Sequence, residues 1–515
     1  MSLHWLDIAA LLFYLFAMLA MGIYFSRKNT STEEYFVGGR SFSGWVIGLS
    51  LVGTSISSVS FLAYPGDAYK TAWLRYLPNL MLPLAILIAA YVFLPFFRRG
   101  KITSAYQYLE HRFGPSVRVY GATAFITGQL VRISIILYLL SLLAQEMTGL
   151  DAVSCIIISG VFVALYTIIG GIDAVIWTDV IQTVVLVAGG LFCLWVVVTE
   201  LPGGFAQIFE VAAAEGKFAF AELKAGVLEP VSWDLSVLDK TGTMILLMGL
   251  TVWLTEYSAN QNTVQRYCAA KSSHEARKAM WVAACSSLPI WAFFMFLGTS
   301  LFVFFQQFPT LEATQMLVGD RKAEAILPYF IANYLPPGLV GLVIAAAGAA
   351  AMSSLDSSIN AISTVSVVDI YRRHLNGGQD DRHYLKAAWV IASVTSVLMI
   401  AGAIYLTYAE TKTLQDTATI LVSLLGGGLL GMYLLGFFTR KGDARSVWVG
   451  IAFTMLFTAW TILAKNGLVP ERFSAPFDLY YTGFIGNLVM FVIGYVVATL
   501  LPRKDKDLKR LTVWD

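Results

Sequence analysis

Long apolar stretches fill most of this 515-residue chain, and they restrict the environments in which it can fold. A helix needs about 20 mostly apolar residues to cross the hydrocarbon core of a bilayer. By that measure the sequence contains roughly thirteen spanning runs, near residues 5–25, 44–65, 76–97, 118–147, 151–169, 176–199, 242–264, 280–305, 337–371, 386–408, 415–437, 446–464 and 479–501. Hydrophobic residues make up 57% of the chain and charged residues only 13%, whereas about 25% of a soluble globular protein is charged. We therefore expect an all-α integral membrane protein with about 13 transmembrane helices.

The charge pattern and the motifs exclude several classes of function. The formal net charge is +2, and no basic cluster with interleaved aromatic residues offers a nucleic-acid site. The triple glycine at 426–428 lacks the Lys-Ser/Thr pair of a phosphate-binding loop, so ATP-driven transport is not expected. No nucleophile, base and orienting group can be assembled from motifs, so we do not expect an enzyme. Membrane lipid is therefore an expected partner, and we expect the protein to be a monomer.

Basic residues recur in the loops that follow the odd-numbered runs, while the intervening loops are poor in basic charge. These loop residues are Arg27, Lys28, Arg40, Arg98, Arg99, Lys101, Arg112, Lys271, Arg277, Lys278, Arg372, Arg373, Arg440, Lys441 and Arg445. The positive-inside rule then places the N-terminus outside and the tail at 503–506, which carries three basic residues, in the cytoplasm. The first run has no basic flank before it, so we interpret it as a retained helix of a multi-pass protein of the cell (inner) membrane.

Two of the runs contain polar, helix-weakening interruptions. The second run carries Gly53 followed by a hydroxyl-rich stretch at 54–58, and the seventh carries the polar stretch 255–263. Such breaks are tolerated in a membrane only where the freed backbone groups face a cavity or other protein. If runs 2 to 6 and runs 7 to 11 are two inverted halves, the breaks fall in corresponding positions, which is typical of secondary transporters.

No linker divides the chain into soluble domains, so we predict five consecutive segments. They are a first transmembrane helix with an internal loop (1–43), a first inverted repeat (44–200), an external loop with a short surface helix (201–240), a second inverted repeat (241–440), and two C-terminal helices with a short cytoplasmic tail (441–515). The ninth run, at 337–371, is longer than a bilayer requires, so its helix should tilt or protrude.

A serine cluster in the ninth run indicates an ion site. Ser354, Ser357 and Ser358 are spaced by three and four residues, so they lie on one face of a helix. The alanine-rich stretch 345–351 before them allows a neighbouring helix to approach closely. Sodium takes several oxygen ligands, and backbone carbonyls of a broken helix together with hydroxyls can supply them. The alternative is that each serine only bonds the carbonyl of the preceding turn.

Three ionisable residues lie inside apolar runs, where charge is costly and usually marks an ion or substrate path. Asp179 could hold an ion, or it could cap the start of the sixth helix. Asp356 could be a coupling carboxylate, or the partner of a nearby arginine or hydroxyl. Arg132 is the only basic residue in the interior of its run, so it must face a cavity, an internal carboxylate or an anionic substrate.

The segment after the second run mixes aromatic and polar side chains near the expected outer mouth. It carries Tyr69, Trp73, Arg75 and Asn79. This mixture suits stacking on, and hydrogen bonding to, a polyhydroxylated ligand. Aromatic residues are also common at any membrane interface, so both interpretations stay open.

Several motifs taken in order resemble one transporter family. They are YFVGGR at 35–40, GGIDAVIWTD at 170–179, VQRY at 264–267, SSLDSS at 353–358 and DIY at 369–371. The chain resembles the sodium:solute symporter family over nearly its whole length. This resemblance implies a five-plus-five inverted-repeat core of the LeuT type, with one helix before the core and two after it. It also implies alternating access driven by inward sodium.

Within that family, KITSAYQYLE at 101–110 and the Ile-rich setting of Arg132 are most similar to bacterial sialic acid symporters. The resemblance implies a principal sodium site made by backbone oxygens of Gly53 and Ile56 and by the hydroxyls of Ser354, Ser357 and Ser358. It implies a second sodium at Asp179, near the last two of these serines. Arg132 would then clamp the carboxylate of a sugar acid, and the remaining contacts would come from Ser55, Ser57, Ser60, Arg75 and Asn79.

The chain departs from that branch at positions that affect the ligand more than the ion. Arg75 and Asn79 stand where the branch has an aromatic residue and a glutamine, and Asp356 stands where it has a third serine. The sodium ligands are intact, so the expected function is sodium-coupled import of a small polar solute, with a carboxylated sugar such as sialic acid as the expected substrate. Neutral sugars, monocarboxylates and amino acids are the alternatives. A sensor on the same fold and an uncoupled facilitator are the competing functional classes.

Overall fold

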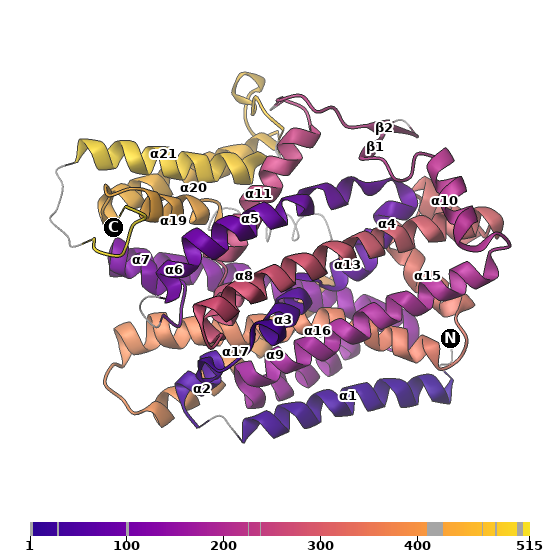
Figure 1. Cartoon of the computed structure of the whole chain (residues 1–515), viewed down its shortest axis with the longest axis horizontal. Helices are drawn as coiled ribbons and strands as arrows, with labels where there is room; N and C mark the ends of the chain where they lie inside the picture. Colours follow the sequence, from indigo (N-terminus) through magenta and orange to yellow (C-terminus); the bar gives the residue numbers. More distant parts are fainter. Residues whose placement is uncertain are drawn as a thin grey trace.

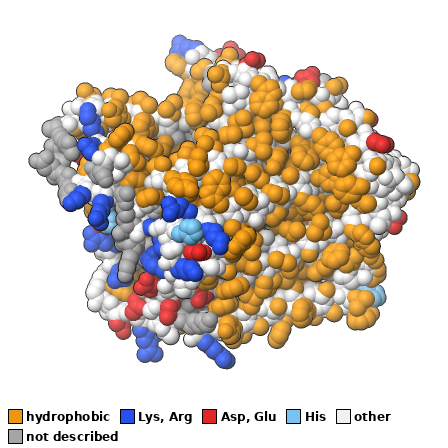
Figure 2. Space-filling model, in the orientation of Figure 1, with side chains coloured by type: hydrophobic (Ala, Val, Ile, Leu, Met, Phe, Trp, Pro, Cys, Tyr) orange, Lys and Arg blue, Asp and Glu red, His pale blue; other side chains and the backbone are white. Residues whose placement is uncertain are grey.

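The computed structural model describes residues 4–27, 30–98, 102–224, 226–236, 238–408, 426–465, 467–478, 481–501 and 508–514. Within this part of the chain nine helices are long and apolar enough to cross a membrane, and a bent pair of helices makes a tenth. Figure 1 shows them running side by side along the molecule, with the N-terminus at one end and the C-terminus at the other. In Figure 2 hydrophobic side chains cover most of the visible surface, and Lys and Arg side chains gather at the end that holds the C-terminus.

The first part of the chain contains α1 (Trp5–Ser26), α2 (Thr32–Val37), η1 (Gly38–Arg40), α3 (Gly44–Ser55), α4 (Ser58–Lys70), η2 (Trp73–Met81), α5 (Leu82–Ile88), η3 (Ala89–Phe93), α6 (Leu94–Arg98), α7 (Tyr106–Arg112), α8 (Pro115–Thr148) and α9 (Ala152–Glu200). The second part contains α10 (Gly204–Ala214), β1 (Ala221–Lys224), β2 (Val227–Pro230), α11 (Gly242–Ser258), α12 (Gln261–Ala269), α13 (Ser273–Gln307), α14 (Leu311–Val318), η4 (Ala323–Ala325), α15 (Ile326–Tyr334), α16 (Leu339–Val365), η5 (Ser366–Leu375), α17 (Asp381–Tyr408), α19 (Leu429–Phe438), α20 (Ala444–Lys465), η6 (Glu471–Phe473) and α21 (Thr482–Leu500). Because α9 packs against α1, α3, α8 and α16, it lies near the centre of the fold.

Both predicted helix breaks are present. The α3 helix ends where Ile56 adopts an extended conformation, and the following helix sets off at an angle of 56°. The α11 helix ends at Ser258, and Asn260 caps the next helix by accepting a hydrogen bond from the backbone N–H of Asn262 at 3.0 Å. Each break therefore frees backbone groups inside the bundle.

The two predicted runs at 151–169 and 176–199 both lie in α9. This helix continues through both as one element of 49 residues, bent at Gly171, where φ is 59° and ψ is −160°. Only glycine adopts this backbone conformation without strain, so the bend depends on that residue. A helix of that length would extend about 74 Å, more than twice the roughly 30 Å hydrocarbon core, so Gly171 divides it into two spanning parts.

A carboxylate fastens the first helix to the core. Asp7, which is buried in the first turns of α1, accepts hydrogen bonds from the backbone N–H groups of Gly338 and Gly341 at 2.7 and 2.8 Å. These N–H groups belong to the N-terminal end of α16, where helical donors lack intrahelical partners. The first helix thus caps α16 as well as packing on it.

The connecting segments contain more structure than the sequence indicates. The predicted short surface helix in 201–240 is α10, and it is followed by an antiparallel hairpin of β1 and β2. The segment before α16 contains the short helices α14 and α15. At the opposite end the tail docks on the core, where the indole of Trp514 donates to the carbonyl of Phe438 at 2.7 Å.

Some sequence predictions fall outside the described residues. Of the eleventh run, the structure describes α19 but not 415–425. The basic tail residues at 503–506, together with Lys28, Arg99 and Lys101, also lie outside the described ranges.

Candidate functional site

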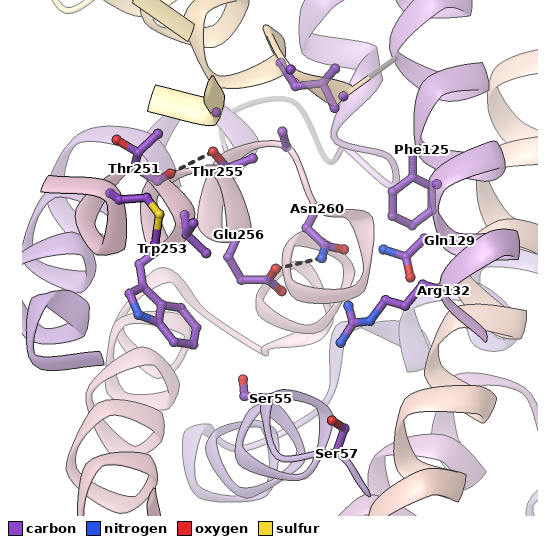
Figure 3. Close-up of a pocket in the computed structure, with 18 of the residues that line it drawn as sticks. Ser55, Ser57, Phe125, Gln129, Arg132, Thr251, Trp253, Thr255, Glu256 and Asn260 are labelled. Atoms are coloured by element: carbon purple, nitrogen blue, oxygen red, sulfur yellow. Dashed lines mark hydrogen bonds between the residues drawn. The ribbon is translucent and has the colours of Figure 1, made fainter. Parts of the chain in front are cut away.

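A cavity of about 1020 Å³ opens beside both helix breaks. Its walls come from α3 and α4, from α8, from α11 and the break that follows it, and from the C-terminal helices α20 and α21. Figure 3 shows side chains from these elements converging on one space. All the predicted substrate residues line it, namely Ser55, Ser57, Ser60, Arg75, Asn79 and Arg132.

Arg132 presents a charge to this cavity. It lies in the middle of α8, and Figure 3 shows its guanidinium directed into the open space. Within the described part of the chain it makes no ion pair and no hydrogen bond through its side chain. An internal carboxylate partner, one of the sequence alternatives, is therefore not found among the described residues. An unpaired guanidinium in an apolar wall attracts an anionic group and can bind a carboxylate through two parallel hydrogen bonds.

Two of the four residues predicted near the outer mouth, Arg75 and Asn79, are already engaged. Arg75 forms a salt bridge with Asp67, and its side chain is 41% exposed. Asn79 is buried and donates from Nδ2 to the hydroxyl of Tyr64 at 2.7 Å. Arg75 thus carries a compensated charge near solvent, whereas Arg132 carries an uncompensated charge deeper in the wall.

Glu256 and Gln129 also line the cavity, although sequence reasoning gave them no role. Glu256 accepts a hydrogen bond from Asn260 Nδ2 at 2.7 Å and another from Thr263 Oγ1 at 2.5 Å. It is the one carboxylate among the described lining residues. A carboxylate inside an apolar run was the signal that could have identified it, as it did for Asp179.

The break in the second span meets the serine cluster. Ser353 donates its hydroxyl hydrogen to the carbonyl oxygen of Gly53 at 2.9 Å. The neighbouring Ser354 is buried, and its hydroxyl has no hydrogen-bond partner among the described residues. Leaving a buried hydroxyl unpaired costs about 1–3 kcal/mol, so an oxygen-seeking cation at this point would remove that penalty. The residues present therefore fit a sodium site, with Ser353 as a candidate ligand that sequence reasoning missed.

Gly53 also allows α3 to pack closely on α9. A Cβ atom at this position would lie 2.8 Å from Thr183 Oγ1 and 3.0 Å from the carbonyl oxygen of Asp179. Real Cβ atoms do not approach other atoms so closely without a shift of the backbone. The missing side chain lets α3 lie directly against α9, beside Asp179. Ile56, the other predicted backbone ligand, is buried at the end of the same helix.

Asp179 lies at the centre of a buried charged cluster. Its Oδ2 accepts hydrogen bonds from Ser50 Oγ at 2.5 Å and from Arg266 Nη2 at 2.7 Å. The same guanidinium nitrogen donates to Ser357 Oγ at 2.5 Å, while Asp179 Oδ1 has no partner among the described residues. Asp179 is well inside α9 and fully buried, so the alternative that it caps a helix start is wrong.

The remaining members of the serine motif have separate partners. Ser358 Oγ donates to Gln129 Oε1 at 3.0 Å, which joins α16 to the cavity wall on α8. Asp356 Oδ2 accepts from the hydroxyl of Tyr166 at 2.8 Å and from that of Thr178 at 3.4 Å. Hydroxyl groups, rather than an arginine, are therefore the observed partners of Asp356. The structure thus places Ser354, Ser357 and Ser358 in three adjacent but distinct polar environments.

Comparisons with known proteins agree with this arrangement. The sequence model of the Sodium:solute symporter family matches residues 35–452. The chain belongs to the sodium:solute symporter family. As a member of that family it is a sodium-coupled transporter.

Two bacterial relatives match this symporter over nearly its full length. It is 32% identical to the sodium/sialic acid symporter SiaT of Proteus mirabilis, with 99% of this chain and 98% of the relative covered. It is 30% identical to the sodium/sialic acid symporter NanT of Aliivibrio fischeri, with 96% and 93% covered.

Solved structures extend the comparison to the fold. The symporter superimposes on the substrate-bound, outward-open state of a Na⁺-coupled sialic acid symporter with a TM-score of 0.86 at 32% identity, covering 97% of this chain and 99% of the other. Mhp1, a nucleobase-cation-symport-1 family transporter, matches with a TM-score of 0.54 at 15% identity, covering 94% and 98%, which shows a shared fold alone.

Proposed function

We propose that this symporter imports a carboxylated sugar of the sialic acid type, coupled to the inward movement of sodium. The observation that carries the proposal is the unpaired guanidinium of Arg132 in a cavity of about 1020 Å³. The cavity adjoins the helix break at the end of α3. There the carbonyl oxygen of Gly53 accepts a hydrogen bond from Ser353, which lies next to the serine cluster. The likeness to two sodium/sialic acid symporters supports the choice of substrate.

Arg132 acts as the carboxylate clamp in this proposal. A planar guanidinium and a carboxylate form two parallel hydrogen bonds, which fix the orientation of the ligand as well as its charge. The ring hydroxyls and the acyl group then meet Ser55, Ser57, Ser60 and Asn79, with Arg75 nearer the mouth. Trp253 offers an apolar face in the same cavity.

The principal sodium ligands in this proposal are the backbone oxygens of Gly53 and Ile56 and the hydroxyls of the serine cluster. The unpaired hydroxyl of Ser354 supports this set. The second sodium is assigned to Asp179, with Ser357 and Ser358 nearby, because Asp179 Oδ1 is buried and unpaired among the described residues. Sodium supplies positive charge and fixed coordination, which join the broken helix to α16.

Coupling then follows from shared elements. The break between α3 and α4 contributes Ser55, Ser57 and Ser60 to the cavity, and it contributes Gly53 and Ile56 to the ion site. A sodium ion that orders this break also orders the ligand contacts, so ion and ligand raise each other's affinity by the same factor.

We also infer an architecture of 13 transmembrane helices with two inverted repeats. The division of α9 at Gly171 supports two crossings there, and the breaks after α3 and α11 support the correspondence of the halves. The basic side chains at the C-terminal end of the molecule support a cytoplasmic tail and an external N-terminus.

A panel of ligands tests the proposed function. Purified protein is heated with sialic acids, neutral sugars, monocarboxylates and amino acids, each in sodium and in potassium. We expect the melting temperature to rise with a sialic acid only in sodium, and Arg132→Ala to abolish the rise. A rise with a neutral sugar that survives Arg132→Ala would keep the symporter but overturn the substrate and its clamp.

A further inference from the structure

Two opposite charges face the cavity from different helices without meeting. Arg132 projects from α8 and Glu256 from α11, and Figure 3 shows both directed into the same space, with Asn260 between them. No ion pair joins them in the part of the chain that the structure describes. A ligand in this cavity therefore meets a cationic group and an anionic group at different positions.

Two neutral donors hold the carboxyl group of Glu256 in place. Both of its oxygens accept hydrogen bonds, one from Asn260 and the other from Thr263. These two bonds hold the break that follows α11, because Asn260 also caps α12.

The two bonds leave acceptor capacity facing the cavity. A carboxylate has about four lone-pair sites, of which the bonds to Asn260 and Thr263 use two. Glu256 is only partly buried and lines the cavity directly. Figure 3 shows the carboxyl group directed into the cavity, where it can accept hydrogen bonds from a ligand and, when ionised, repels a ligand group of the same sign.

We propose that Glu256 determines specificity at the end of the ligand remote from Arg132. It accepts hydrogen bonds from a hydroxyl or an ammonium group there, and it rejects a second carboxylate. The preferred ligand class is therefore a monoanionic sugar acid with a donor-rich tail, and dianionic ligands of similar size are excluded. This inference rests on the proposed function, because it assigns the carboxylate of the ligand to Arg132.

Charge complementarity explains why this arrangement selects by both attraction and repulsion. Discrimination between ligands is a difference of affinities, and a like charge in the pocket is an effective way to weaken the unwanted complex. In a partly buried site the repulsion between two carboxylates is screened much less than in water. We expect it to weaken binding of a dianion by at least about tenfold, which corresponds to about 1.4 kcal/mol.

Three sialic acids that differ at one position test the inference in purified full-length protein. They are N-acetylneuraminic acid, its 9-amino-9-deoxy analogue and its 9-carboxylate analogue, whose dissociation constants are measured in sodium. In the wild type we expect the 9-carboxylate to bind at least about tenfold more weakly than the parent, and the 9-amino analogue to bind at least as tightly. In Glu256→Gln, which keeps the shape and one acceptor oxygen, both differences should shrink to within about threefold.

Glu210→Gln is the matched control, because it removes the same charge from an exposed position on α10. It should leave all the affinity ratios at their wild-type values. If Glu256→Gln retains those ratios too, the specificity role of Glu256 is overturned while sodium-dependent sialic acid binding stands. If the wild type binds none of the three ligands in sodium, the proposed function itself is overturned, and the assignment of Glu256 fails with it.

Discussion

The hydroxyl of Ser353 donates a hydrogen bond to the carbonyl oxygen of Gly53 at 2.9 Å, and this contact joins α16 to the broken second span. The unpaired hydroxyl of Ser354 lies next along the chain. Asp356, two residues further along α16, and Asp179 on α9 are both buried carboxylates. In the proposed mechanism, sodium binds beside this contact and orders the helix break that lines the ligand cavity.

Replacing Ser354 by alanine should separate ion binding from folding. The variant removes a buried hydroxyl that has no partner among the described residues, so without sodium its stability should equal or exceed that of the wild type. Its apparent sodium affinity should fall by at least about tenfold. The measurement is the melting temperature across a sodium titration.

Ser300→Ala is the control for that titration. Its hydroxyl is also buried but donates to the carbonyl of Phe296 at 2.7 Å within α13. This variant should keep the sodium response of the wild type. An unchanged sodium midpoint in Ser354→Ala would remove Ser354 from the ion site.

Asp179→Asn should be strongly destabilising, because it leaves the buried guanidinium of Arg266 without its carboxylate. Breaking a buried ion pair on one side costs about 3–5 kcal/mol. The double variant Asp179→Asn/Arg266→Gln should recover part of that loss. Because Asp179 holds the second ion in our proposal, the Hill coefficient for sodium binding should fall from about two toward about one in both the single and the double variant.

Calorimetric unfolding with a parallel sodium titration checks both parts of the Asp179 prediction. A double variant no more stable than Asp179→Asn would contradict the ion pair. A wild-type Hill coefficient in the double variant would remove Asp179 from the second sodium site.

Gly53→Ala should weaken packing between α3 and α9. The added methyl group would lie 2.8 Å from Thr183 Oγ1 and close to the backbone of Asp179, so the helices must separate. Overpacking of this kind costs about 1–3 kcal/mol, and sodium affinity should fall with it.

Gly348→Ala in α16 is the control, since nothing lies within 4 Å of its added methyl group. It should raise helix stability by about 0.5–1 kcal/mol. Equal effects of the two variants on sodium binding would contradict the role of Gly53.

Glu110 joins two arginines in a network of α7, α8 and η5. It forms salt bridges with Arg118 and Arg373, and Arg118 also pairs with Asp369 at 2.6 Å. Burial opposes ionisation of Glu110, but the two guanidinium groups outweigh it and hold its pKa below the ordinary value of 4.5. As the pH falls, the unfolded chain therefore binds the proton first.

The stabilisation by Glu110 is thus present above about pH 4.5 and is lost as the pH falls through the folded pKa. Glu110→Gln should lower the free energy of unfolding at pH 7 by about 1–3 kcal/mol and should flatten its acid dependence. Arg373→Gln should have a smaller effect, because that side chain is 53% exposed. Unfolding measured from pH 7 down to about pH 3.5 tests this. An acid profile unchanged in Glu110→Gln would contradict the assignment.

The sequence predicted the features that depend on local composition. Apolar length predicted the spanning helices, and polar interruptions predicted the breaks near Ile56 and Asn260, because exposed backbone in a membrane needs a polar lining. The charges inside apolar runs, Arg132 and Asp179, were likewise visible as costly exceptions.

The rest depends on contacts between distant segments. The link from Arg266 to Asp179 and the bond from Ser353 to Gly53 cross 87 and 300 residues of chain, and no local pattern specifies such pairs. The bend at Gly171, which lies between two predicted runs of α9, was not identified from the sequence, because a single glycine can bend a helix without the polar interruption that usually reveals a break.

Sodium-driven uptake of labelled N-acetylneuraminic acid into proteoliposomes tests the assignment of coupling ion, substrate and clamp together. We predict accumulation under an inward sodium gradient and none under an equal potassium gradient. Arg132→Ala should raise the half-saturating concentration by at least about thirtyfold, since losing one member of a buried charge contact costs about 2–5 kcal/mol. Arg75→Ala should have a smaller effect, because Arg75 is paired with Asp67. Uptake that is indifferent to sodium, or that is unchanged in Arg132→Ala, would contradict this account of the symporter.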